Sequence, residues 1–141
     1  MGADVTDAVA AKQLDRARLI CLALPGATEK VAWGAPTFRA PDKLFAMFAD
    51  RHHGDARVAL WCHAPQGSQQ VLCHAQPDRY FVPPYVGVKG WVGIDLARVG
   101  DAELRERVIE AYRMVAKKTL LKELESGEEA QLAKTERRRK A

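Results

Sequence analysis

The 141-residue sequence lacks the features that define several classes of protein. Its three cysteines, Cys21, Cys62 and Cys73, are odd in number and fit buried, reduced thiols better than a disulfide framework. No apolar run approaches the roughly 20 residues that a membrane-spanning helix needs. The N-terminal segment MGADVTDAVAAKQLDRARL mixes acidic and basic side chains, unlike a signal or transit peptide. These absences predict a cytoplasmic protein that does not associate with membranes.

Motifs for catalysis and metal binding are also scarce. The pairs Cys62-His63 and Cys73-His74 raise the question of a metal site, but neighbouring residues on a strand point to opposite faces and the spacing is unlike that of structural zinc sites. Either histidine could in principle activate a cysteine or Ser68 as a nucleophile. The sequence has no nucleophile elbow, no phosphate-binding glycine loop and no paired carboxylates at a spacing typical of catalysis. We therefore predict no catalytic residue, no metal site, no cofactor and no enzymatic activity.

The charge is mildly basic, with a net value of +4 and an isoelectric point near 9.1. Most of the excess lies in residues 117–141, and bases also outnumber acids between residues 30 and 91. A basic sheet surface between more acidic helices would suit a phosphate-rich partner. A solvated surface of mixed charge explains the same composition.

The hydrophobic pattern changes period along the chain. Residues 7–24 place Leu14, Ala17, Cys21 and Leu24 on one helical face, and Pro25-Gly26 ends this helix. Residues 43–49 and 57–63 are apolar runs separated by the turn RHHGD, which predicts an antiparallel hairpin.

The second half of the sequence adds a short helix over residues 65–75, strands over 79–82 and 90–96, and a helix that begins near Asp101. This order predicts an α+β two-layer sandwich. We expect one domain over residues 1–124, because the length suits a single core. Residues 125–141 form a charged tail that is either a frayed helix or disordered.

Basic residues alternate with aromatic ones in the middle of the chain, as in Phe38-Arg39, Arg79-Tyr80 and Lys89-Gly90-Trp91. Cations neutralise phosphates and aromatic faces stack on bases, so this combination suits nucleic acid. The same aromatic residues could instead pack between the sheet and a helix or line a dimer interface.

Three ordered blocks carry a resemblance to a known family: LALPGATEKVAWGAPTFRAPDKLFAMF, VKGWVGIDL and IEAYRMVAKKTLL. Together they resemble the MmcQ/YjbR family of small proteins usually labelled DNA-binding. The resemblance implies a CyaY-like (frataxin-like) fold in which an antiparallel sheet carries the N- and C-terminal helices on one face. It also implies DNA binding through the sheet and its projecting loops, and it brings no catalytic residues.

The first hypothesis is a non-enzymatic module that binds duplex DNA with little sequence preference. In this hypothesis the phosphate contacts come from Arg39, Lys43, Arg79 and Lys89, Trp91 lies on the exposed sheet face, and Lys117 and Lys118 extend the patch. The sequence contains no recognisable reading helix, so any specificity would come from loops or DNA shape. The oligomeric state is not predicted.

The alternative hypothesis is a binding module for a small anionic ligand or a protein partner. Trp33, Arg39, Lys89 and Trp91 would line its cleft. Salt separates the two hypotheses, because displacing counterions from several phosphates gives a steep loss of affinity and a single anionic contact gives a shallow one.

Overall fold

The computed structural model describes the backbone of residues 2–140 and the side chains of residues 8–138 other than His53. Within these residues, six strands form one antiparallel sheet in the order β1-β2-β3-β4-β6-β5. The strands are β1 (Thr28–Ala32), β2 (Ala35–Arg39), β3 (Leu44–Asp50), β4 (Val58–Cys62), β5 (Tyr80–Phe81) and β6 (Val92–Asp95). The helices are α1 (Gly2–Leu22), α2 (Ser68–Ala75), α3 (Asp101–Val115) and α4 (Lys118–Lys140), with short 3-10 turns η1 (His52–Gly54), η2 (Val86–Lys89) and η3 (Leu96–Arg98). The predicted α+β fold is confirmed.

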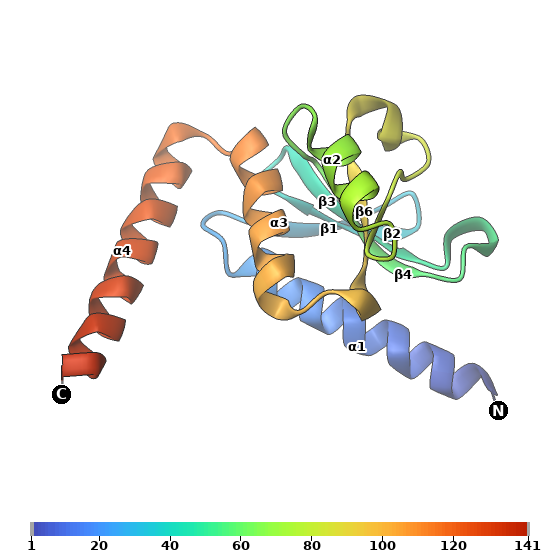
Figure 1. Cartoon of the computed structure of the whole chain (residues 1–141), viewed down its shortest axis with the longest axis horizontal. Helices are drawn as coiled ribbons and strands as arrows, with labels where there is room; N and C mark the ends of the chain where they lie inside the picture. The colour runs from blue at the N-terminus through green and yellow to red at the C-terminus, as the bar shows by residue number, and fades with distance from the viewer. Residues whose placement is uncertain (1, 141) are drawn as a thin grey trace.

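Helices α1 and α3 both pack against strands β3 and β4, so they share one face of the sheet (Figure 1). The main core lies between these two layers and includes Phe38, Leu60, Ile94 and Tyr112. The rings of Phe45 on β3 and Tyr112 on α3 meet edge to face with centroids 5.7 Å apart. The helical stripe and the two apolar runs predicted from the sequence therefore meet in one core.

The opposite face of the sheet, here called the second face, carries a smaller cluster of Ala49, Ala59, Trp61 and Trp91. Strand register extends this face across the sheet, because Met47 pairs with Trp61, Trp61 with Gly93, and Gly93 with Phe81. The apolar side chains that pack on the cluster are Leu44, Met47, Phe81 and Val86, which come from strands and η2. Loops rather than α-helices thus border the second face.

The hairpin of β1 and β2 turns through Trp33 and Gly34, whose φ angles are 52° and 73°. Two consecutive left-handed residues are typical of a type I′ turn, which matches the right-handed twist of paired strands. Neither β1 nor β2 was predicted as a strand from the sequence. The residues of β1 are half exposed or exposed at the edge of the sheet, so the apolar alternation that identifies a half-buried strand is weak there.

Helix α4 contacts the rest of the protein through its N-terminal part. Leu120, Leu121 and Leu124 pack on the main core, and a methyl carbon of Leu120 lies 2.9 Å from the point where a Cβ of Gly26 would be. The later turns extend away from the body of the molecule (Figure 1). Residues 125–140, predicted as a frayed helix or as disorder, continue α4 as a helix; the side chains of Arg139 and Lys140, and Ala141, lie outside the described residues.

No helix in the described part of the chain is both long and apolar enough to cross a membrane.

Candidate functional site

Three of the predicted cations lie at one end of the sheet. Arg39 is the last residue of β2, Lys43 precedes β3, and Lys89 closes η2 just before β6. Register brings these positions to the same end, because Arg39 pairs with Leu44, while Ala46 and Val92 both pair with Cys62. We call Arg39, Lys43 and Lys89 the cationic end.

The described residues place no carboxylate in an ion pair with the cationic end. Arg39 donates from Nε to the Oγ1 of Thr37 and from Nη1 to the carbonyl of Asp42, and the donor–acceptor distance is 3.3 Å in both hydrogen bonds. Lys43 and Lys89 are exposed. Among the described residues, none of the three forms an ion pair. Thr37 lies on the second face, since its partner Met47 does, so Arg39 borders that face.

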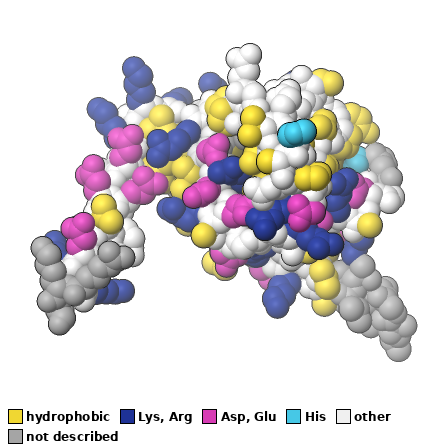
Figure 2. Space-filling view, viewed as in Figure 1, with side chains coloured by type: hydrophobic (Ala, Val, Ile, Leu, Met, Phe, Trp, Pro, Cys, Tyr) yellow, Lys and Arg dark blue, Asp and Glu magenta, His cyan; other side chains and the backbone are white. Residues whose placement is uncertain are grey.

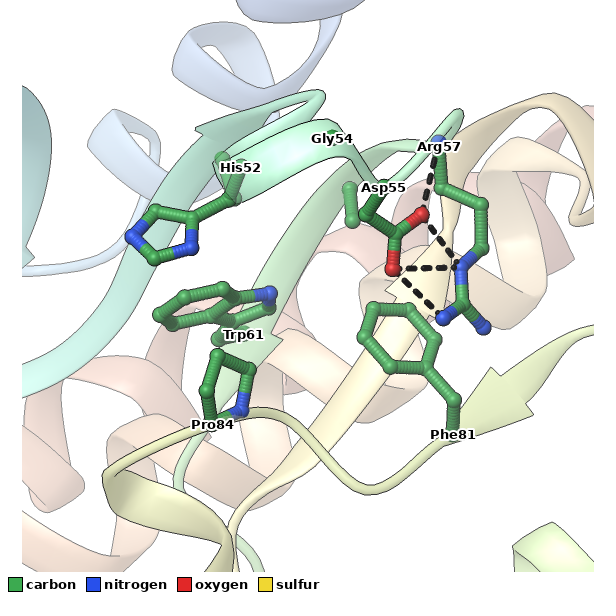
Figure 3. Close-up of a pocket in the computed structure, with 9 residues that line it drawn as sticks. His52, Gly54, Asp55, Arg57, Trp61, Phe81 and Pro84 are labelled. Carbon is green, nitrogen blue, oxygen red and sulfur yellow. Dashed lines mark hydrogen bonds and ion pairs between the residues drawn. The ribbon is translucent and has the colours of Figure 1, made fainter.

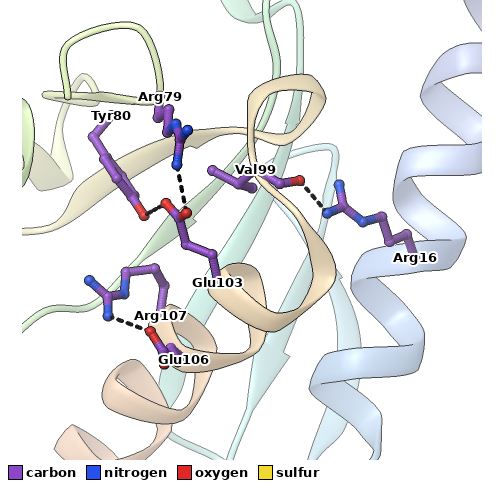
Figure 4. A network of polar contacts seen from close by, with 7 residues as sticks. All are labelled: Arg16, Arg79, Tyr80, Val99, Glu103, Glu106 and Arg107. Carbon is purple, nitrogen blue, oxygen red and sulfur yellow. Dashed lines mark hydrogen bonds and ion pairs between the residues drawn. The ribbon is translucent and has the colours of Figure 1, made fainter.

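Arg79 does not belong to this group. It precedes β5, where its carbonyl accepts from the backbone N–H of Asp95, at the end of the sheet opposite Arg39. Its Nη1 donates to the carboxylate of Glu103 on α3 at a distance of 2.8 Å, and the hydroxyl of Tyr80 donates to the same carboxylate (Figure 4). Arg79 is thus partly neutralised on the helix side, where acidic and basic side chains are intermixed (Figure 2).

Lys117 and Lys118 are exposed at the junction of α3 and α4. Tyr112, in the last turns of α3, donates to the carbonyl of Pro25 just before β1, so the junction lies on the helix side of the sheet. The structure therefore does not place these two lysines on the second face.

The prediction that Trp91 is exposed is wrong, because its side chain is only 5% exposed. It does lie on the second face, as the strand alternation predicted, but that face is covered at this point. The ring stacks on His63 with centroids 5.2 Å apart and planes 26° apart, and Val86 of η2 packs on the same cluster. Burial lowers the pKa of His63, whose Nδ1 is buried without a hydrogen-bond partner in the described structure. Trp91 therefore supports the face and does not offer a ring for stacking.

The cleft of the alternative hypothesis is not formed as predicted. Trp33 is 77% exposed at the tip of the β1–β2 hairpin, at the opposite end of β2 from Arg39. With Trp91 buried, and with Trp33 and Arg39 at opposite ends of β2, the four residues do not line one cleft.

A different pocket, of about 390 Å³, opens on the second face beside the β3–β4 loop. In Figure 3, His52, Trp61 and Pro84 lie on one side of it, and Asp55, Arg57 and Phe81 lie on the other. The ring of His52 meets Trp61 edge to face, with centroids 5.0 Å apart. The pocket is lined by Ala49, His52, Gly54, Asp55, Arg57, Ala59, Trp61, Phe81 and Pro84.

The polar wall of the pocket is an internally balanced ion pair. Arg57 donates from Nε and Nη2 to the carboxylate of Asp55, with a shortest distance of 2.6 Å. These bonds lower the pKa of Asp55, so its carboxylate is ionised at neutral pH. The guanidinium carbon of Arg57 also lies 3.5 Å from the centre of the Phe81 ring, a cation–π geometry. The wall thus carries one fixed positive and one fixed negative charge.

This pocket was not predicted from the sequence, in which RHHGD indicated only a turn. One signal for it was present. Ala49, Ala59 and Gly93 are small residues on three adjacent strands, on the face where Met47 and Trp61 are large. Small side chains between large ones on one sheet face leave a hollow.

No group of three or more His, Cys, Asp or Glu residues that could hold a metal ion occurs in the described part of the chain. Cys62 is fully buried, and burial raises its pKa, which disfavours the thiolate that a metal or a nucleophilic reaction requires.

Comparison with known proteins identifies the family. The YjbR family model matches residues 22–114, which include the whole sheet and most of α3. The chain belongs to the YjbR family. The match also covers the cationic end and the pocket of this YjbR protein, but ends before Lys117 and Lys118.

A solved relative supports the fold of this YjbR protein. The crystal structure of the Deinococcus radiodurans protein DR2400, a DUF419 domain, matches with a TM-score of 0.61 at 21% identity, covering 75% of this chain and 80% of that one. At this identity the likeness shows the fold alone. A comparison with curated proteins finds no significant match.

Proposed function

We propose that the protein binds nucleic acid without catalysing a reaction on it, through phosphate contacts at the cationic end. One observation carries the proposal: Arg39, Lys43 and Lys89 gather at one end of the sheet with no ion-pair partner among the described residues. Lys and Arg side chains without an ion-pair partner, exposed at the end of a sheet, are suited to a phosphate backbone.

The proposed binding has little sequence preference. Phosphate contacts fix the position and orientation of a nucleic acid but carry no sequence information. The second face is bordered by loops, and no α-helix of the described residues lies on it to enter a major groove. Affinity is therefore expected to depend strongly on salt and weakly on sequence.

The test is a fluorescence anisotropy titration with a labelled random-sequence oligonucleotide at several salt concentrations. Each phosphate contact contributes about 0.7 to 0.9 to the slope of log affinity against log salt. The triple variant Arg39→Ala, Lys43→Ala, Lys89→Ala is expected to reduce that slope by about 2 to 3. A parent protein without salt-sensitive binding at low ionic strength contradicts the proposal.

A matched control variant removes the same number of positive charges from a different part of the surface. Lys12, Arg98 and Arg105 are exposed on α1, η3 and α3, and none of them forms an ion pair among the described residues. Replacing these three by Ala changes the net charge by the same amount but leaves the cationic end intact. If the control lowers the slope as much as the first variant does, the binding comes from net charge and not from this site.

A further inference from the structure

The side chains that line the pocket on the second face are suited to a flat ring. The pocket walls include the rings of His52 and Phe81 together with Pro84, the buried ring of Trp61 packs against His52, and the small residues Ala49 and Ala59 leave the volume open. About 390 Å³ lies within the range of pockets that take small organic groups. Aromatic and proline walls around such a volume favour a planar ligand that can stack.

The electrostatics of the pocket argue against an anion. The Nε and Nη2 edge of the Arg57 guanidinium is already engaged by Asp55, so a phosphate or carboxylate could use only the outer Nη1 and Nη2 edge, close to the Asp55 carboxylate. The ionised carboxylate of Asp55 would also repel a second negative group. A carboxylate accepts hydrogen bonds and cannot donate them. The pocket therefore suits an uncharged ring with an N–H donor on its edge.

Arg39 of the cationic end borders the second face, on which the pocket opens. Lys43 and Leu44 mark one end of β3, and Ala49 in the pocket is near the other end. A strand of seven residues spans about 20 Å. A nucleic-acid strand that runs along this side of the molecule, over the loop residues that cover Trp61 and Trp91, can thus contact the cationic end with its phosphates and reach the pocket several nucleotides away.

From this arrangement, and resting on the proposed function, we infer that the pocket holds one unpaired base of a single-stranded nucleic acid. In a duplex, the faces of each base are stacked on its neighbours, so a base can enter an aromatic pocket only when it is unpaired. The cations hold the backbone and the neutral pocket holds the ring. The preferred partner is then a single strand, which differs from the duplex expected from the sequence.

The experiment compares three fluorescent ligands of equal length with the full chain: a mixed-sequence single strand, its duplex, and a strand of abasic sugar-phosphate units. Stacking of one base corresponds to a roughly 5- to 150-fold gain in affinity. We expect the single strand to bind more tightly than the abasic strand by a factor in this range, and more tightly than the duplex. Equal affinity for the single strand and either of the other two ligands overturns the inference.

A variant that fills the pocket tests whether the preference for a strand with bases comes from this pocket. Ala49→Leu adds a side chain to the pocket, and Ala11→Leu adds the same side chain to the exposed surface of α1. Ala49→Leu is expected to abolish the preference over the abasic strand while keeping the salt slope, and Ala11→Leu is expected to change neither. His52→Ala, which removes part of one wall, provides a second test if Ala49→Leu does not fold. A preference that persists in a folded pocket variant overturns the inference.

A free nucleoside carries the same ring as an unpaired base of a strand. Deoxyadenosine and deoxycytidine therefore test whether the pocket binds the ring without a strand. We expect millimolar nucleoside to leave strand binding unchanged, because the phosphate contacts supply most of the affinity. Nucleoside binding without salt-sensitive strand binding overturns both the proposed function and the strand as the source of the base. Salt-sensitive binding with no preference for unpaired bases overturns only the inference about the pocket.

Discussion

Gly93 determines where the ring of Phe81 can lie. A Cβ at position 93 would fall 2.4–2.7 Å from three carbons of that ring, far closer than normal contact. Phe81 is directly opposite Gly93 in the sheet, and the guanidinium of Arg57 lies over its ring. The absence of a side chain at position 93 therefore supports one wall of the pocket.

We predict that Gly93→Ala lowers the free energy of unfolding by about 1–3 kcal/mol, because the added methyl group must displace the Phe81 ring. Urea denaturation measures the change. Gly127→Ala is the matched control, since a Cβ there meets nothing within 4 Å and α4 gains a better helix former. A Gly93→Ala variant as stable as the parent would show that the ring position is not fixed by this contact.

Trp33 combines exposure with backbone strain. It is 77% exposed and has a φ angle of 52°, a conformation that Asn and Gly adopt readily and bulky residues do not. We predict that Trp33→Asn raises the free energy of unfolding by about 1 kcal/mol, since strain of this kind costs about 1–3 kcal/mol. Trp33→Phe keeps the strain and should give no gain. Equal thermal midpoints for the two variants would refute this explanation.

At the scale of elements, the sequence pattern was most informative where a segment is long or fully buried. Strands β3 and β4 follow from uninterrupted apolar runs, and α1 and α3 follow from apolar stripes. Strand β1 was missed because TEKVA is half polar and lies at the edge of the sheet, where one neighbour is absent and burial is low. Edge strands carry less of the hydrophobic alternation on which sequence reasoning relies.

The candidate site was only partly predictable, for a physical reason. Arg39, Lys43 and Lys89 were chosen from local pattern, but their placement at one end depends on the order of strands that are distant in sequence. Trp91 was misjudged because alternation gives the face of a residue and not what covers that face. The pocket depends on a cross-strand contact between Gly93 and Phe81, which no local pattern encodes.

Helix α4 supplies a prediction at the element scale. Leu124 is 5% exposed in its N-terminal half, whereas Leu132 is 61% exposed two turns later. We predict that Leu124→Ala lowers the free energy of unfolding by about 2–4 kcal/mol, because it removes a buried side chain and leaves a cavity. Leu132→Ala should change it by less than about 0.5 kcal/mol. Equal losses in urea denaturation would mean that the outer turns of α4 also pack in solution.

At the scale of the whole molecule, the main core buries several groups that lose a proton in alkaline solution. Burial raises the pKa of Cys21 and Cys62, and it also raises the pKa of Tyr80 and Tyr112. The hydroxyl of Tyr80 donates to the carboxylate of Glu103, which adds to the increase in its pKa. Unfolding returns all four groups to water, where cysteine ionises near pH 8.5 and tyrosine near pH 10.

The sign of the pH dependence follows from these shifts. Below about pH 8.5 both the folded and the unfolded chain keep these protons, so the groups do not make stability depend on pH. Above it the unfolded chain binds fewer protons than the folded one. The free energy of unfolding must therefore fall as the pH rises, by up to about 1.4 kcal/mol per pH unit for each group.

We predict that the free energy of unfolding at about pH 10 is at least about 2 kcal/mol lower than at about pH 7.5, mainly because of the two buried cysteines. Urea denaturation across this range measures the decrease. Cys62→Ala removes one of the titrating groups and should make the decline shallower by about 1–2 kcal/mol, even if the variant is less stable at every pH. The slope separates titration from packing, since a purely structural loss would lower the whole curve without changing its shape. A parent protein with constant stability between these pH values would show that the thiols reach water before the chain unfolds, through local opening of the layer between α1, α3 and the sheet.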